Sequence, residues 1–256
     1  MRIITKNRLI QVSFLPRIFP VNCYLVEEED GVTLIDAALP YSAEGIIRAA
    51  ALSFGKPLTR IVLTHAHDDH VGALDALKAK YPDIPVYISA RDARLLEGDV
   101  SLDPSEPQTP IRGGVPKKVA TRADVLLAEG DRVGSLQVVA SPGHTPGSIS
   151  LLDNRDGALV VGDAFQTRGG IAVSGIVRPL FPFPALATWN AETALNSAIK
   201  LATLRPSLLA AGHGKMIGNP AGALAKAIEQ AERKLGVTPS RIKGEGEESY
   251  VAKSGN

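Results

Sequence analysis

The stretch Thr64-His65-Ala66-His67-Asp68-Asp69-His70 (64–70) holds three of the five histidines of the chain, together with two aspartates. It follows the apolar run RIVLT (60–64), which predicts a buried strand, and it precedes apolar residues at helical spacing. Because alternate side chains of an extended segment point the same way, His65 and His67 are expected to face one side. Asp69 and His70 lie in the turn into the helix, so we expect their side chains to point to a neighbouring position. Imidazole and carboxylate groups bind zinc, iron, manganese and cobalt, so this stretch predicts a metal site.

The remaining two histidines occupy similar positions at other predicted strand ends. His144, in Ser-Pro-Gly-His-Thr-Pro-Gly, follows the predicted strand 135–140. His213, in Gly-His-Gly, follows the predicted strand 207–211. Asp163, in Gly-Asp-Ala, ends another apolar run in the same manner. Small neighbours allow the backbone to approach an ion closely, so these three residues are further candidate ligands.

The composition of the 256 residues is that of a globular protein, with 45% hydrophobic and 21% charged residues. The net charge is +1 and no basic run is present, which disfavours a nucleic-acid partner. The single cysteine, Cys23, excludes an internal disulfide and a zinc module built on two or more cysteines. No apolar run approaches the ~18 residues that span a bilayer, and early charges interrupt any signal-peptide core. We therefore expect a cytoplasmic protein that acts on a small-molecule substrate, without a membrane partner.

Strand-like and helix-like segments alternate along the chain. Strand patterns are expected at 21–28, 32–37, 60–64, 85–89, 124–128, 135–140, 148–153, 158–162 and 207–211. Helical spacing is expected around 43–50, 71–81, 195–202 and 224–235, with long irregular segments at 98–118 and 167–187. This order suggests two α/β halves whose sheets pack together with helices outside. Because composition shows no linker, we expect one domain over 1–256, with a polar tail from about residue 238.

The complete set of motifs resembles the metallo-β-lactamase-fold hydrolase superfamily. The pattern consists of HxHxDH at 65–70, followed by PGHTPG, GDA and GHG, and it includes all five histidines. The resemblance spans roughly residues 8–236. It implies an α+β fold, a four-layer αββα sandwich of two packed mixed sheets with helices outside. It also implies two divalent metal ions, Zn²⁺ being favoured over Mn²⁺, Fe²⁺ or Co²⁺. The first would be bound by His65, His67 and His144 and the second by Asp69, His70 and His213, with Asp163 bridging them.

A dinuclear centre of this kind activates water, because two cations lower its pKa toward ~7. The resemblance implies hydrolysis of a carboxylic ester, lactone or thioester by a metal-bridging hydroxide, with Asp69 as a catalytic proton shuttle. Three alternatives stay open. They are phosphoester or phosphotriester hydrolysis at the same centre, persulfide oxygenation at a mononuclear iron, and a non-catalytic metal-binding role.

Several better-known branches of the superfamily fit this sequence poorly. The commonest zinc β-lactamases use a cysteine in the second site, whereas Cys23 precedes every candidate ligand. Glyoxalase II usually carries a long helical C-terminal extension, but only 43 residues follow His213. Acyl-homoserine lactonases tend to place a tyrosine shortly after the bridging aspartate, where this chain has Ala164-Phe165-Gln166. The motifs are therefore specific for the fold and the metal site, and they do not name the substrate.

The segment 165–189 is the expected source of substrate selectivity. It leaves the strand that ends at Asp163 and is rich in apolar residues, so we expect it to overhang the metals. Phe165, Phe181 and Phe183 are the candidate substrate-binding residues, and an apolar rim would favour acyl substrates. The alternatives are that this segment packs a second small core or forms a homodimer contact.

Overall fold

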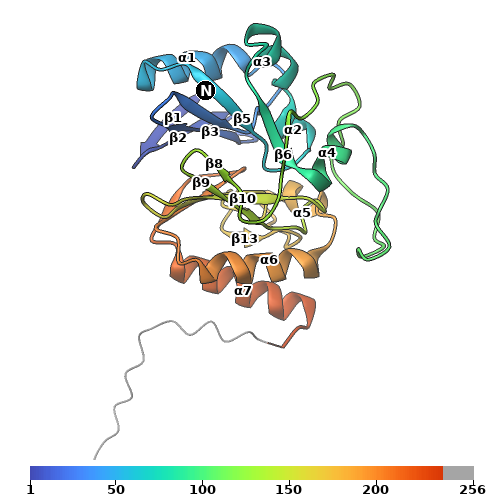
Figure 1. Cartoon of the computed structure of the whole chain (residues 1–256). Helices are drawn as coiled ribbons and strands as arrows, with labels where there is room; N and C mark the ends of the chain where they lie inside the picture. The colour runs from blue at the N-terminus through green and yellow to red at the C-terminus, as the bar shows by residue number, and fades with distance from the viewer. Residues whose placement is uncertain (239–256) are drawn as a thin grey trace, which may run out of the picture.

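Two β-sheets face each other in the computed structural model, which describes residues 1–238 (Figure 1). The polar tail predicted from about residue 238 lies outside the described residues, apart from its first residue. The first sheet runs in the order β1 (Arg2–Lys6), β2 (Leu9–Phe14), β3 (Val21–Glu27), β4 (Val32–Ile35), β5 (Leu58–Val62), β6 (Val86–Ser89) and β7 (Val125–Leu127). The second runs in the order β15 (Ile217–Gly218), β14 (Leu208–Ala211), β11 (Ala158–Gly162), β10 (Ile149–Asp153), β9 (Leu136–Ala140) and β8 (Arg132–Val133). A separate pair consists of β12 (Phe165–Gln166) and β13 (Ala172–Val173).

Both sheets are mixed and have the same plan. In the first, β1 to β4 form an antiparallel meander, and β4 to β7 pair in parallel. In the second, β8 to β11 form the meander and β14 pairs in parallel with β11. Because a parallel strand needs a crossover connection, helices are placed on the outer faces of both sheets.

The helices complete the four layers predicted from the sequence. They are α1 (Ala43–Phe54), α2 (Asp68–Val71), α3 (Leu74–Lys80), α4 (Ala90–Leu96), α5 (Phe183–Leu186), α6 (Ala191–Thr203) and α7 (Ala221–Leu235). Figure 1 shows α1 and α3 on the outer side of the first sheet, and α6 and α7 on the outer side of the second. This confirms the αββα sandwich. Within residues 1–238, no helix combines the length and apolar character that crossing a bilayer requires.

The central strands are buried on both faces, which explains why they are nearly continuous apolar runs. On β3, Val21, Cys23 and Leu25 join the core under the helices of the first half, whereas Tyr24 and Val26 join the core between the sheets. This alternation follows the two-residue period of an extended strand. Cys23 is a fully buried core residue, and burial raises the pKa of its thiol.

Two of the features that the sequence patterns did not predict bear on the site and its supporting sheet. The first is the β1–β2 hairpin, whose edge strand β1 is partly exposed and carries charges that hide the strand pattern. The second is α4, a short helix in which charged and apolar residues alternate. Ser89 caps it, because its Oγ accepts a hydrogen bond from Asp92 N at 3.1 Å. The predicted helix at 71–81 is also divided into α2 and α3.

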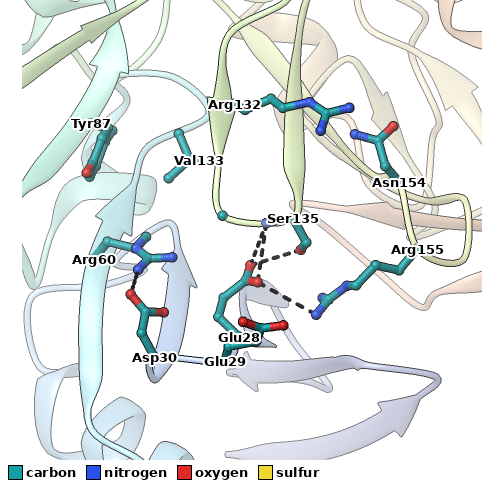
Figure 2. Close-up of a pocket in the computed structure, with 11 residues that line it drawn as sticks. Glu28, Glu29, Asp30, Arg60, Tyr87, Arg132, Val133, Ser135, Asn154 and Arg155 are labelled. Carbon is teal, nitrogen blue, oxygen red and sulfur yellow. Dashed lines mark hydrogen bonds and ion pairs between the residues drawn. The ribbon is translucent and has the colours of Figure 1, made fainter.

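Polar contacts join the two halves at one edge of the sandwich, around a cavity of about 700 Å³ (Figure 2). The buried carboxylate of Glu28 follows β3 and accepts hydrogen bonds from Ser135 N and Oγ, at 3.1 and 2.9 Å. Arg155 Nη1 lies 3.6 Å from the same carboxylate. This is the edge at which β4 and β5 begin, so the residues that follow these two strands emerge at the opposite edge.

Candidate metal centre

All seven predicted ligands lie together at the edge where β5, β9, β11 and β14 end. They are His65, His67, Asp69, His70, His144, Asp163 and His213. Six of the seven are buried, and Asp69 is half-buried. The parallel strands bring them together, because the carboxyl ends of parallel neighbours meet at one edge of a sheet.

The first group consists of His65, His67 and His144. One nitrogen of each ring lies within 4.8 Å of the corresponding nitrogens of the other two. His67 Nδ1 and His144 Nε2 are 2.9 Å apart. The structure therefore brings the three imidazoles of this group together.

The second group consists of Asp69, His70 and His213. Its ligand atoms also lie within 4.8 Å of one another, and His213 Nε2 is 3.4 Å from Asp69 Oδ2. Asp69 and His70 come from the first turn of α2, whereas His213 comes from the loop after β14. The two halves of the sandwich thus each contribute ligands to this group.

The carboxylate of Asp163 lies between the two groups. Its Oδ2 is 3.4 Å from His144 Nε2 and 3.1 Å from His213 Nε2. Its Oδ1 is 3.5 Å from His70 Nε2. Asp163 therefore contacts one histidine of the first group and two of the second, which is the position a bridging ligand needs.

The polar atoms at the centre fit a bound cation. His65 Nε2, His70 Nε2 and Asp163 Oδ1 are buried, and none makes a hydrogen bond within the described part of the chain. Buried polar groups nearly always have partners, so three such atoms facing one another fit a bound cation. Zinc, manganese, iron and cobalt are all suited to this set of nitrogen and oxygen donors.

The outer nitrogens of the histidines are held by oxygen atoms, which fixes the rings. His67 Nε2 is 2.9 Å from Arg112 O, His213 Nδ1 is 2.7 Å from Pro20 O, and His70 Nδ1 is 2.8 Å from Asp36 Oδ2. A carbonyl oxygen can only accept, so the proton of a neutral ring must lie on the outer nitrogen. The inner nitrogen then presents its lone pair to the centre, as in metal-binding histidines.

Burial and the nearby carboxylates set the protonation of the rings. Burial lowers the pKa of His144 to about 3, and it also holds the pKa of His65 and His67 below the usual range. These rings are neutral near pH 7, which is the form that binds metals. Burial acts the same way on His213, but the charge of Asp163 outweighs it and raises the pKa of that ring to about 10. The second group therefore favours a positive charge.

Two buried aspartates that the sequence analysis missed support the ligand loops. Asp36 directly follows β4 and accepts hydrogen bonds from Thr64 N at 2.7 Å and Thr64 Oγ1 at 2.8 Å, besides its contact with His70. Its position directly after a strand, like that of Asp163, could have indicated a role at the site. Asp92 lies on the unpredicted helix α4, and its local sequence did not indicate such a role. It accepts hydrogen bonds from Ala66 N, Thr145 Oγ1 and Gly147 N.

The long loop predicted at 98–118 also reaches the centre. Gly114 O accepts a hydrogen bond from Asp68 N at 2.7 Å, and Gly113 has a φ of 92°. A Cβ on Gly113 would lie 2.6 Å from the ring of His67, so glycine is required there. Between this loop and α2 lies a cavity of about 880 Å³ whose lining includes Asp69, Val115 and Lys117.

An aromatic cluster lies against the second group. Phe19, from the loop between β2 and β3, has its ring centroid 5.1 Å from those of both Phe181 and Phe183. Phe19 and Phe181 each lie 5.4 Å from the ring of His213. Phe183 is 52% exposed, whereas Phe181 is buried. The predicted segment thus contributes two rings beside the centre, and Phe19 was missed because nothing in its local sequence pairs it with that segment.

Phe165 does not lie with this aromatic cluster. Its side chain is fully buried in the core beneath α6 and α7, together with Leu195 and Ala198. The short strand β12 pairs with β13 and turns the ring of Phe165 away from the surface. The expectation that Phe165 contacts substrate is therefore corrected, and for this residue the alternative of core packing holds.

The four-layer sandwich and its edge of histidine and carboxylate groups define a metallo-hydrolase type of protein. The chain belongs to the metallo-beta-lactamase superfamily, whose sequence model matches residues 16–213. This family assignment agrees with the motifs and with the observed layers.

Relatives and a solved structure extend this assignment. An uncharacterized protein of Bacillus subtilis strain 168, YobT, is 56% identical over 91% of this chain and 100% of its own length. YflN of the same organism, a probable metallo-hydrolase, is 33% identical over 75% of this chain and 80% of its own length. The crystal structure of TTHA1623 in a di-iron-bound form is 28% identical, with a TM-score of 0.59, and covers 83% of this chain and 96% of that one. The named metallo-hydrolases support a metal-dependent hydrolase.

Proposed function

We propose that this protein is a hydrolase with a dinuclear metal centre that acts on a carboxylic ester, lactone or thioester of a small molecule. The observation that carries the proposal is the position of Asp163, whose Oδ2 lies within 3.4 Å of both His144 and His213, one from each ligand group, while its Oδ1 faces His70. One tetrahedral ion cannot use seven protein ligands, whereas two ions can and still leave open positions. The di-iron form of TTHA1623 supports two ions in a related chain. Zinc remains our first expectation from the donor set.

When bound, two divalent ions would supply Lewis acidity and lower the pKa of water toward neutrality. The protein groups would then orient the substrate and move the proton. Asp69 is suited to the second task because it lines the cavity beside α2, whereas the other six candidate ligands are buried. Burial opposes its ionisation, but His70 and His213 outweigh it and hold the pKa of Asp69 below its usual range. The lowered pKa keeps Asp69 ionised, and its position at the cavity wall, not its basicity, suits it to relay a proton to solvent.

Metal analysis tests the dinuclear centre. We expect protein purified without chelator to contain close to two equivalents of transition metal per chain, since both groups of ligands are complete. Elemental analysis of the purified protein measures this directly. A firm value of one equivalent, unchanged after addition of zinc or manganese, would contradict the proposal.

A substrate panel tests the reaction class. The metal-loaded protein should hydrolyse members of a panel of lactones, esters and thioesters, and phosphoesters serve as the competing class. Oxygen uptake with a persulfide, in protein that contains only iron, would instead support the oxygenase alternative. A dimer contact through the segment 165–189 stays a prediction that sedimentation analysis can test.

The aromatic cluster predicts a chain-length effect on substrate selection. Phe183→Ala removes a half-exposed ring beside the centre, so we expect a higher KM for a long-chain ester, by about 5- to 150-fold for contact area worth roughly 1–3 kcal/mol. A short activated ester should be little affected, and kcat should be kept if the contact is equal in ground and transition states. Phe165→Ala is the contrasting variant, because that ring is in the core. Its loss should reduce the stability of the protein without favouring one ester over the other. Equal losses on both esters in Phe183→Ala would show that the ring has a structural role only.

A further inference from the structure

The loop that carries His213 is held by side chains from the other half of the sandwich. Asn22 Nδ2 donates to Ala211 O at 2.8 Å and to Gly214 O at 3.0 Å. The hydroxyl of Tyr24 donates to Ala211 O at 2.6 Å, and Gln11 Nε2 donates to Gly214 O at 3.0 Å. These three side chains therefore bind the loop just before and just after the histidine.

These contacts are made in a fully buried environment. Gln11, Asn22 and Tyr24 are at most 1% exposed, so water cannot replace a lost partner. Gln11 Nε2 also lies 3.1 Å from the hydroxyl of Tyr24, which links two of the three side chains. Burial raises the pKa of Tyr24, so its hydroxyl stays protonated and remains a donor. Leaving one of these groups unpaired would cost more than the bond itself contributes.

Within its own half of the sandwich, the loop is held by Gly212 N, which donates to Gly162 O at 2.8 Å, and by Thr167 N, which donates to His213 O at 2.9 Å. Glycines flank His213 on both sides, and neither has a side chain to pack. They are required, because a Cβ on Gly212 would lie 2.2 Å from Asp163 Oδ1 and one on Gly214 would lie 2.3 Å from Thr167 Oγ1. A glycine-bounded loop is intrinsically free, so hydrogen bonds from neighbouring elements must determine where it lies.

The strand β3, which carries Asn22 and Tyr24, and the residue before it also orient the ring of His213. Pro20 O, directly before β3, accepts the hydrogen bond from His213 Nδ1 at 2.7 Å, and Asn22 N donates to Gly212 O at 2.9 Å. The opposite nitrogen, Nε2, lies 3.1 Å from Asp163 and 3.4 Å from Asp69. A small shift of the loop would therefore change the geometry of the second ligand group.

We propose that Asn22 and Tyr24 are positioning residues that fix His213 and so set the metal affinity of the group Asp69, His70 and His213. The inference rests on the proposed dinuclear function. It assigns a role to the hairpin β2–β3, which lies outside every ligand motif and whose residues contribute no ligand. The group His65, His67 and His144 makes none of these contacts within residues 1–238, so its affinity should not depend on them.

The test is a metal titration of the metal-free, full-length protein. Isothermal titration calorimetry with Zn²⁺, repeated with Co²⁺ to follow the visible spectrum, should resolve two binding steps in the wild type. In Tyr24→Phe and in Asn22→Asp, one step should weaken by about 10- to 100-fold, the usual effect of removing a partner that orients a ligand. The other step should be unchanged. Gln11→Met, which removes a single bond to the loop, tests the same proposal if either variant fails to fold.

Ser13→Ala is the matched control. Ser13 is buried in the same cluster and donates to Asn22 Oδ1, but it has no hydrogen bond to the 211–214 loop. It should lose stability to urea while keeping both binding steps. Two binding steps with wild-type affinities in Tyr24→Phe and Asn22→Asp would overturn the proposal. The same weakening of one step in Ser13→Ala would also overturn it. A wild type that binds no second metal would contradict the dinuclear function itself, which keeps the two failures distinguishable.

Discussion

Asp163→Ala is expected to reduce hydrolytic turnover by about two orders of magnitude or more and to weaken at least one of the two metal ions. The carboxylate contacts His144 and His213 through one oxygen and faces His70 through the other. Two cations held at short range repel each other, and the bridging charge offsets that repulsion. Alanine removes the charge and both oxygens while leaving the strand β11 intact, so the fold should be largely kept.

Metal content and turnover on the best ester of the panel measure this effect. Asp153→Ala is the matched control, because Asp153 is as buried as Asp163 and also lies at the end of a strand. Its partner is Arg155, away from the ligands. The control should lose stability and keep its metals. Wild-type turnover and metal content in Asp163→Ala would show that the bridging assignment is wrong. His70→Ala should affect mainly the second group.

Asp92→Ala is expected to be the most destabilising of the substitutions considered, at about 3 kcal/mol or more in the free energy of unfolding. Its carboxylate is fully buried and accepts hydrogen bonds from Ala66 N, Thr145 Oγ1 and Gly147 N. These donors belong to the two loops that carry the first ligand group. Alanine would leave Ala66 N and Gly147 N unpaired in the interior, whereas Thr145 Oγ1 would keep its contact with Ser148 Oγ at 2.6 Å, and the substitution would release one loop from the other.

Urea unfolding with and without added Zn²⁺ measures the effect. Bound metal stabilises the folded state by mass action, so weaker metal binding should also reduce the stabilisation that Zn²⁺ provides. Asp75→Ala is a matched control, since Asp75 accepts the same number of hydrogen bonds, from Ala120 N, Thr121 N and Thr121 Oγ1, but is only partly buried. Asp75→Ala should lower the free energy of unfolding by less than Asp92→Ala does, and it should leave the stabilisation by Zn²⁺ unchanged. Equal unfolding curves for Asp92→Ala and the wild type would contradict the role given to Asp92.

Local sequence patterns were sufficient for most of the sheet and for the grouping of the candidate ligands. Apolar runs of four to seven residues are typical of buried strands when turn residues bound them. Short motifs after such runs place His65, His144, Asp163 and His213 at strand ends. The edge strand β1 and the helix α4 escaped prediction because their charged residues interrupt the apolar period, and β2 was missed together with its hairpin partner. Tertiary contacts at the sheet edge, and the Ser89 cap, stabilise them instead.

The directions of the side chains in the irregular segment 165–189 could not be predicted from the sequence. Three phenylalanines there looked equivalent, yet Phe165 is in the core, Phe181 is buried against His213 and Phe183 is half-exposed. Without a regular period, no rule relates the position of a residue to the face on which its side chain lies. The partner ring of Phe19 lies more than 140 residues away in the chain.

By itself, the sequence determined the fold class, the superfamily and the residues that can bind metal, because each of these depends on local motifs and on the period of apolar residues. Only the tertiary structure decided which groups support those ligands. Asp36, Asp92, Asn22 and Tyr24 act across strands or across the two halves, through hydrogen bonds between residues far apart in sequence. A hydrogen bond of this kind leaves no periodic trace, since its two partners are brought within 3 Å only when the sheets have packed together.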